Sequence, residues 1–277
     1  WAAKPAGGKG YAQAERVLSA EKGGNWKQQR TWEDRKVPAG FEIALIGRDS
    51  KVVVDSAVKD VNGVNIGSAA PDMPTLTIQA GGALKVDNLF VVWTTRTNST
   101  AAFELKGGAL QVGSPDFGEA CMVVGTGMTF SGKAVATFSG GKYTGGLRAG
   151  TTQNNHTGKL VFRGSDVKVE CGKYGRSVFE LEQTGSVDFI LDEKGIATLD
   201  YSAGRGVSFA SGSQITVNGA AYTGGTKTFT LIAGPANFTD NGANFSVVHF
   251  PETLTASLQV EPHKKGKALV LKIKAVK

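Results

Sequence analysis

The chain has 277 residues, of which 40% are hydrophobic, and a formal net charge of +7. It is long enough to bury a sizeable core, and no apolar run reaches the roughly 18 residues that a transmembrane helix needs. Glycine is abundant, with 38 residues against 8 prolines. Since glycine does not recur at every third position, a collagen triple helix is excluded. This composition predicts many tight turns between short strands.

The positive charge is concentrated at the two ends of the chain. Residues 1–36 carry a net charge of +4 and residues 261–277 carry +5, which leaves the middle near −2. Basic ends suit contact with an anionic polysaccharide, lipid head groups or acidic patches on a neighbouring copy. Alternatively, the lysines keep exposed strands soluble and discourage wrong edge pairing. We expect no nucleic acid partner, because basic and aromatic residues do not interleave and no nucleic-acid module is recognisable.

Residues 1–40 are expected to form an N-terminal arm or cap. The stretch AQAERVLSAEK at 12–22 predicts a short helix. The polar stretch GGNWKQQRTWEDRKVP at 23–38 contains Trp26 and Trp32. These tryptophans either cover the first unit of the fold that follows, offer a stacking platform for sugar, or dock into another subunit.

Residues 41–221 restate one pattern, in which an apolar strand, a small-residue turn and a second apolar strand follow each other. Examples are TLTIQAGGALKV at 75–86 and AAFELKGGALQV at 101–112. Successive units are 27, 33, 24, 27 and 20 residues apart when aligned on the last apolar residue of the first strand. The aligned residues are Ile78, Leu105, Phe138, Phe162, Phe189 and Phe209.

A period near 26 residues is long enough for one coil of two or three short strands, and such a coil cannot bury its own apolar face. Stacked coils would pair each strand with its equivalent in the next coil, and glycines at equivalent places would form the corners. The sequence therefore predicts an all-β protein, a single-stranded parallel β-solenoid (β-helix). A β-sandwich is the alternative, because the intervals between units are irregular.

Residues 222–277 are expected to form a C-terminal β cap. The segments 254–260 and 269–274 alternate apolar and polar residues on either side of the turn EPHKKGK, which predicts a β-hairpin. TFTLIAG at 228–234 and FSVVHF at 245–250 are predicted to be strands beside it.

Several of these segments resemble the bacterial exported β-strand-repeat proteins, whose autotransporter-like passenger repeats occur in many surface proteins. The likeness lies in GGNWKQQRTWEDRKVP, PTLTIQAGGALKV and the ending TFTLIAG…TLTASLQV…KALVLKI, and it covers most of the chain. It implies an exported, surface or extracellular β-solenoid and carries over no catalytic or ligand residue. The ending AVK lacks a hydrophobic sorting tail, which favours a released or self-assembling product.

No constellation of residues indicates catalysis, so we expect no enzyme, no cofactor and no metal. His156, His249 and His263 lack the spacing of metal ligands. Cys121 and Cys171 are expected to be free, buried thiols, with a disulfide as the alternative if the loop at 113–121 brings them together. A glycosidase would need two carboxylates facing a cleft, for which the candidates are Glu180, Glu182, Asp188, Asp192 and Glu193. Their charges look scattered over solvated faces.

We expect an extracellular or cell-surface structural protein that assembles with copies of itself, as a homopolymer, into a filament, sheath or surface layer. Its first residue, Trp1, fits a secreted chain whose signal peptide has been removed. The predicted contacts are the N-terminal arm and C-terminal strands, with an apolar part formed by Trp26, Trp32, Leu269, Leu271 and Ile273. The alternative is a carbohydrate-binding or adhesive module, for which the candidate exposed aromatic residues are Trp93, Tyr143, Tyr174 and Tyr201.

Overall fold

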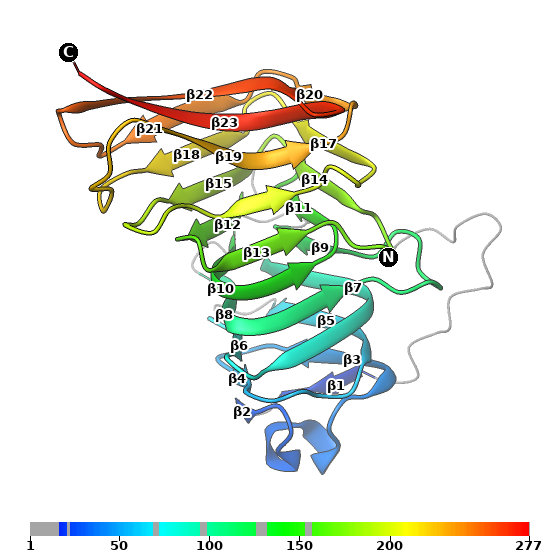
Figure 1. Cartoon of the computed structure of the whole chain (residues 1–277). Coiled ribbons are helices and arrows are strands. Elements are labelled where there is room, and N and C mark those ends of the chain that lie inside the picture. Colours follow the sequence, from blue (N-terminus) through cyan, green and yellow to red (C-terminus); the bar gives the residue numbers. More distant parts are fainter. Residues whose placement is uncertain are drawn as a thin grey trace.

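The computed structural model describes residues 17–20, 23–68, 72–94, 99–125, 132–152 and 157–276. Within them the chain is a parallel β-solenoid of about 8 turns, stacked into a rod (Figure 1). The predicted solenoid is confirmed and the β-sandwich alternative is wrong. The described helices are two short 3₁₀ turns, η1 (Gln29–Thr31) and η2 (Glu33–Arg35), and no described helix has the length and apolarity to cross a membrane.

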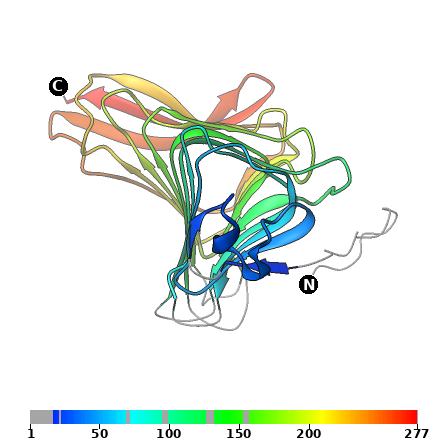
Figure 2. The ribbon, with the colours of Figure 1, turned by 90° about the horizontal axis from the view of Figure 1, so that it is seen from below.

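The strands of the solenoid form three parallel columns, here called sheets A, B and C, which enclose the core when the rod is viewed from its N-terminal end (Figure 2). Sheet C begins later along the chain than the other two. Sheet A contains β1 (Val17–Ser19), β3 (Gly40–Ile46), β5 (Val61–Ser68), the later part of β7 (Ala83–Thr94), β9 (Cys121–Val124), β11 (Leu147–Ala149), β14 (Val178–Leu181), β17 (Gly206–Phe209) and β20 (Phe238–Asp240). Sheet B contains β2 (Gly24–Asn25), β4 (Lys51–Val54), β6 (Thr75–Gln79), the first parts of β8 (Thr100–Val112) and β10 (Lys133–Thr144), β12 (Thr157–Arg163), β15 (Gly185–Ile190), β18 (Gln214–Asn218) and β21 (Asn244–Val248). Sheet C contains the first part of β7, the later parts of β8 and β10, β13 (Val167–Glu170), β16 (Thr198–Asp200) and β19 (Lys227–Gly234).

The core of sheet B follows the column that the repeat alignment predicts. Ile78 lies opposite Leu105, which is followed in the next rungs by Phe138, Phe162 and Phe189, and all five are fully buried. The rings of Phe138 and Phe162 stack at 4.8 Å, and those of Phe162 and Phe189 at 5.4 Å. Offset stacking of this kind adds to the burial of the rings, so the middle of this column is a stack of three phenylalanine rings.

The last residue of the alignment was placed wrongly. Phe209 ends a strand of sheet A, where it pairs with Leu181, whereas the sheet B residue that follows Phe189 is Val217. Each coil of three strands has more than one corner, and the pattern of strand, small turn and strand occurs at corners of different kinds. The interval of 20 residues between Phe189 and Phe209 therefore runs from sheet B to sheet A.

Glycines form the corner between sheets B and C in successive rungs. Gly81, Gly107 and Gly141 have φ of +83°, +100° and +89°, a region that residues with a Cβ rarely adopt. A Cβ on Gly141 would lie 2.1 Å from the carbonyl oxygen of Gly108 in the preceding rung. The abundant glycine thus lets the chain turn sharply while consecutive rungs stay in contact.

The predicted helix at 12–22 is wrong over its described part. Val17–Ser19 is β1, which pairs in parallel with β3, and Leu18 is buried opposite Ala44. Residues 12–16, 21 and 22 lie outside the described residues. Burial of Leu18 in the first rung outweighs a weak local preference for helix, since isolated short helices are marginal.

The predicted C-terminal hairpin is present as β22 (Leu254–His263) and β23 (Gly266–Ala275). β23 pairs antiparallel with β19, so the hairpin lengthens sheet C beyond its last parallel strand. β21 contacts β22, so it lies beside the hairpin as predicted, but its hydrogen-bonded partner is β18 in sheet B. Solenoid pairing therefore continues from β1 and β2 through β19, β20 and β21, on both sides of the range 41–221 assigned from the sequence.

Candidate functional site

The N-terminal end of the solenoid is closed by a tryptophan pair. Trp26 and Trp32 are 0% and 1% exposed, and their rings meet edge to face with centroids 4.8 Å apart. The Trp32 Nε1 donates a hydrogen bond of 2.7 Å to the Trp26 carbonyl oxygen. Because Trp32 bridges to Ala20 beside β1 and both rings are buried, this arrangement is a cap over the core and cannot serve as an exposed stacking platform.

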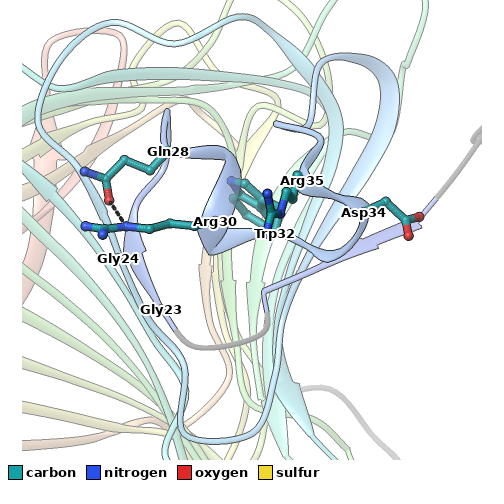
Figure 3. Close-up of a pocket in the computed structure, with 7 residues that line it drawn as sticks. All are labelled: Gly23, Gly24, Gln28, Arg30, Trp32, Asp34 and Arg35. Atoms are coloured by element: carbon teal, nitrogen blue, oxygen red, sulfur yellow. Dashed lines mark hydrogen bonds between the residues drawn. The ribbon is translucent and has the colours of Figure 1, made fainter.

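A depression of about 620 Å³ lies on the outer side of this cap (Figure 3). Gly23, Gly24, Gln28 and Arg30 line one part of it, and Trp32, Asp34 and Arg35 line the rest. The Arg30 Nε donates to the Gln28 Oε1 at 3.2 Å, so this guanidinium is already engaged within the loop. The walls are mainly exposed polar residues of one short loop, and we assign no ligand to the depression.

The five apolar residues predicted to form assembly contacts are inside the chain's own core. Besides Trp26 and Trp32, the structure buries Leu269, Leu271 and Ile273, each at most 1% exposed. Leu269, Leu271 and Ile273 of β23 pair with Val260, Leu258 and Ala256 of β22, and their side chains face the core. Their alternation correctly indicated a strand with one apolar face, but that face is filled by the same molecule. These five residues therefore cannot form contacts with another copy of the folded chain.

The C-terminal end, in contrast, leaves apolar side chains partly uncovered. Leu254, Ala256, Leu258 and Val260 alternate along β22 and are only half-buried. Phe245 and Val247 of β21, the last strand of sheet B, are also half-buried beside the core. In Figure 1, β22 is the outermost strand at this end of the rod. The two ends of the solenoid therefore differ, since the tryptophans at one end are fully buried and the apolar row of β22 at the other is only half-buried.

A second apolar surface lies on the outward face of sheet A, which was not predicted. Val17, Phe41 and Leu89 are 49%, 53% and 39% exposed. Half-exposed apolar residues of β3, β7 and β9 surround them: Ile43, Leu45, Val91, Trp93 and Val123. Contiguous apolar patches of this kind mark interaction surfaces, unlike single exposed apolar residues. The available signal was the apolar residues at the outward positions of FEIALI, which are Phe41, Ile43 and Leu45, and the apolar run VVW, because an outward strand face is usually polar.

Only part of the predicted aromatic set is accessible. Tyr143 and Tyr201 are fully buried, where their hydroxyls donate to the carbonyl oxygens of Gly146 and Gly145. Tyr174 is half-buried in a loop, and Trp93 lies on the outward face of sheet A. The four aromatic residues therefore do not form a line along one face.

Stacking of the rungs gathers the carboxylates that looked scattered. Glu182 accepts a hydrogen bond of 3.1 Å from the Arg148 Nε, and Glu180 accepts one of 3.0 Å from Arg176. Asp188 forms an ion pair of 2.6 Å with Lys159. These contacts stabilise charges that face outward from sheets A and B, and each carboxylate is matched to a basic side chain. The Arg148–Glu182 and Lys159–Asp188 pairs join neighbouring rungs, whereas Arg176 and Glu180 lie four residues apart in the same rung.

The remaining polar candidates have local roles or ordinary surroundings. The Asp192 carboxylate accepts hydrogen bonds from the backbone N–H groups of Lys194 and Gly195, both at 2.9 Å, and so shapes a turn. His249 is exposed and His263 half-exposed, whereas His156 lies outside the described residues. No cluster of three or more metal-ligating side chains occurs in the described part of the chain.

Both cysteines are free thiols, as predicted, although Cys171 is only half-buried. Burial raises the pKa of the Cys121 thiol to about 11. The pKa of Cys171 is also raised, first by burial and then by the nearby Asp200 carboxylate. Since the thiolate is the reactive form, neither cysteine is activated as a nucleophile near neutral pH.

No protein-family model and no curated protein matches this chain. Its resemblance to exported β-strand-repeat proteins therefore stays a prediction. The two uncovered apolar surfaces are the features of the molecule that bear most directly on its function.

Proposed function

We propose that this chain is an extracellular structural protein that assembles with copies of itself into a filament, sheath or surface layer. The observation that carries the proposal is the uncovered C-terminal end, where the half-buried apolar row of β22 lies beside an unpaired strand edge. An exposed strand edge pairs readily with another strand unless charges, proline or a covering segment prevents it. The continuous hydrogen-bonded sheets beneath it supply the stiffness that a structural element needs.

Assembly into a polymer needs two different contacts on each copy, because a single self-complementary contact joins only two copies. The C-terminal end supplies the first. The apolar outward face of sheet A, centred on Leu89 and Phe41, is the candidate for the second. We also keep the N-terminal arm, residues 1–40, as a proposed contact between copies, made by residues other than Trp26 and Trp32.

Replacing Leu258 with lysine is expected to abolish assembly through the C-terminal end. Leu258 is half-buried, so a lysine there can extend to solvent and leave the fold intact, while its charge opposes pairing with another strand. Multi-angle light scattering and negative-stain electron microscopy of the purified chain would record the change from oligomers or filaments to single rods.

Leu89→Lys is the matched variant, since it introduces the same charge at a half-exposed leucine on sheet A. We expect it to leave end-to-end pairs intact and to remove only larger assemblies. Single rods from the unmodified chain at every concentration would refute the proposal. Equal assembly by the unmodified chain and the Leu258→Lys variant would place the contact elsewhere.

A carbohydrate-binding or adhesive surface module is the second candidate, favoured by Trp93. Its indole lies on an outward sheet face and its Nε1 donates to the Asn65 side-chain oxygen, which orients the ring. Exposed aromatic residues held in one orientation are frequent binding hot spots. The basic ends add the prediction that the glycan is anionic, and Lys264, Lys265 and Lys267 at the hairpin turn are exposed.

If the chain binds a glycan through this face, Trp93→Ala should weaken binding about 30-fold, which corresponds to about 2 kcal/mol. A glycan array would find the ligand, and titration calorimetry would compare the two proteins. Tyr174→Ala, which removes a half-buried aromatic residue outside sheet A, is the control and should bind normally. Binding that is unchanged in Trp93→Ala would exclude this face.

A further inference from the structure

The outer edge of β22 carries backbone groups without a strand partner. Among the described residues β22 pairs only with β23, and the Val276 N–H donates to the Thr253 carbonyl at 2.9 Å. In an antiparallel ladder, residues alternate between facing the partner strand and facing away from it. Since Thr253 faces β23, so do the odd-numbered residues that follow, and the even-numbered residues present their N–H and C=O groups to the outside.

The groups that face outward belong to Leu254, Ala256, Leu258 and Val260. The Leu254 N–H is used in the preceding turn, where it donates to the Pro251 carbonyl at 2.9 Å. The N–H groups of the other three residues remain for a partner strand, and so do the carbonyl groups. The middle of β22 therefore exposes a strip of backbone N–H donors and C=O acceptors that can pair with another strand.

The same strip lacks the features that usually protect an edge strand. Residues 254–260, LTASLQV, contain no charge and no proline, and the first residue of either kind is Glu261. Natural sheets protect long edges with lysine, proline, bulges or a covering segment. The neighbouring β23 carries lysines at 267, 272 and 274, so basic residues are available in this region but are absent from the strip.

We infer that two copies of this chain pair tail to tail, through antiparallel β22 strands related by a two-fold axis at Ser257. The inference rests on the proposed self-assembly and adds its partner, symmetry and register. In this register Leu254 of one copy opposes Val260 of the other, and Ala256 opposes Leu258. Every apolar residue of the row meets another apolar residue on the same sheet face, so the pattern is self-complementary.

Neighbouring registers fit less well. An axis at Leu258 would place Leu254 opposite Pro262, which has no N–H to donate. A slip that changes the alternation would put apolar residues of one copy on the same face as Thr255 and Ser257 of the other. Ser257 is also the midpoint of the uncharged strip, residues 254–260, so an axis there pairs every residue of the strip with a residue of the same strip in the other copy. The pair would join sheet C of both rods into one sheet.

The register is tested by disulfide trapping. In the Ser257→Cys variant the two new thiols would face each other across the axis, in a pair that is not hydrogen-bonded, where Cα atoms are about 4.5 Å apart and a disulfide is possible. The full chain carrying Cys171→Ser as background leaves only the buried Cys121 as a native thiol. After mild oxidation, we expect most of the Ser257→Cys protein to run as a covalent dimer on a non-reducing gel.

Thr255→Cys is the matched control, because Thr255 is exposed on the same strand face but opposes Gln259 in the proposed register. Alone it should give almost no dimer. Mixed with Gln259→Cys protein of a different tagged mass, it should give the mixed dimer. Both results together would fix the two-fold position, since chance collisions do not distinguish these pairs.

Two outcomes would overturn the inference in different ways. If Ser257→Cys forms no more dimer than Thr255→Cys while light scattering still finds oligomers, the β22 register is refuted and self-assembly stands. If light scattering finds only monomers, the pairing and the proposed function fall together.

Discussion

Replacing Trp32 with alanine is expected to lower the free energy of unfolding by about 3–5 kcal/mol, the usual cost of removing a large buried aromatic side chain. Trp32 is 1% exposed, contacts Trp26 edge to face and holds its carbonyl by a hydrogen bond of 2.7 Å. Its loss would uncover the end of the apolar core. Urea unfolding followed by circular dichroism would measure the change.

The place along the rod where the structure loosens tests the capping role more directly than the size of the stability loss. Stability in stacked repeats depends on contacts between neighbouring units, so a missing cap should loosen the first rungs most. Hydrogen exchange should speed up at the amides of β3 and β4 and stay slow at β15 and β18. Trp93→Ala, which removes a half-exposed tryptophan, is the control and should cost much less. Similar losses in the two variants would contradict the capping role.

The second large effect is expected at the glycine corner. Gly141→Ala should lower the free energy of unfolding by about 2–4 kcal/mol, because the backbone at φ +89° disfavours a Cβ and the added atom would lie 2.1 Å from the Gly108 carbonyl oxygen. Either the corner opens or the rungs move apart. Differential scanning calorimetry of the two proteins would report the fall in Tm.

Gly225→Ala is the matched control for this prediction. A Cβ on Gly225 would have no atom within 4 Å, and its φ is not positive. Its stability should therefore stay within about 0.5 kcal/mol of the unmodified chain. A neutral Gly141→Ala variant would mean that the corner is free to adopt another turn, and that the repeated glycines are not required by contact between rungs.

The proposed contacts and the two stability predictions concern different parts of the rod. The tryptophan cap and the glycine corner maintain the fold, whereas Ser257, Leu258 and Leu89 lie at surfaces that the fold leaves uncovered. Variants at these surface positions should consequently change assembly with little change in unfolding. This separation allows failure of assembly to be distinguished from failure of folding.

Local sequence signals were enough to predict the solenoid. Alternation with a period of two identifies strands such as Ser186–Phe189, and repeated glycine turns identify corners, because strand pleat and positive φ are properties of a few consecutive residues. The strict alternation of β22 and β23 predicted the hairpin for the same reason. The repeat then implied stacking, since one coil cannot bury its apolar face alone.

Only the tertiary structure decided which apolar residues are inside. Alternation shows that Leu271 and Leu258 lie on one face of a hairpin, but the contacts between strands bury the first and leave the second half-exposed. In the same way, Trp26 and Trp32 became a cap and Phe209 joined a different sheet from the one expected. Burial depends on neighbours a whole coil away, and the number of residues per coil varies, so no local pattern contains that information.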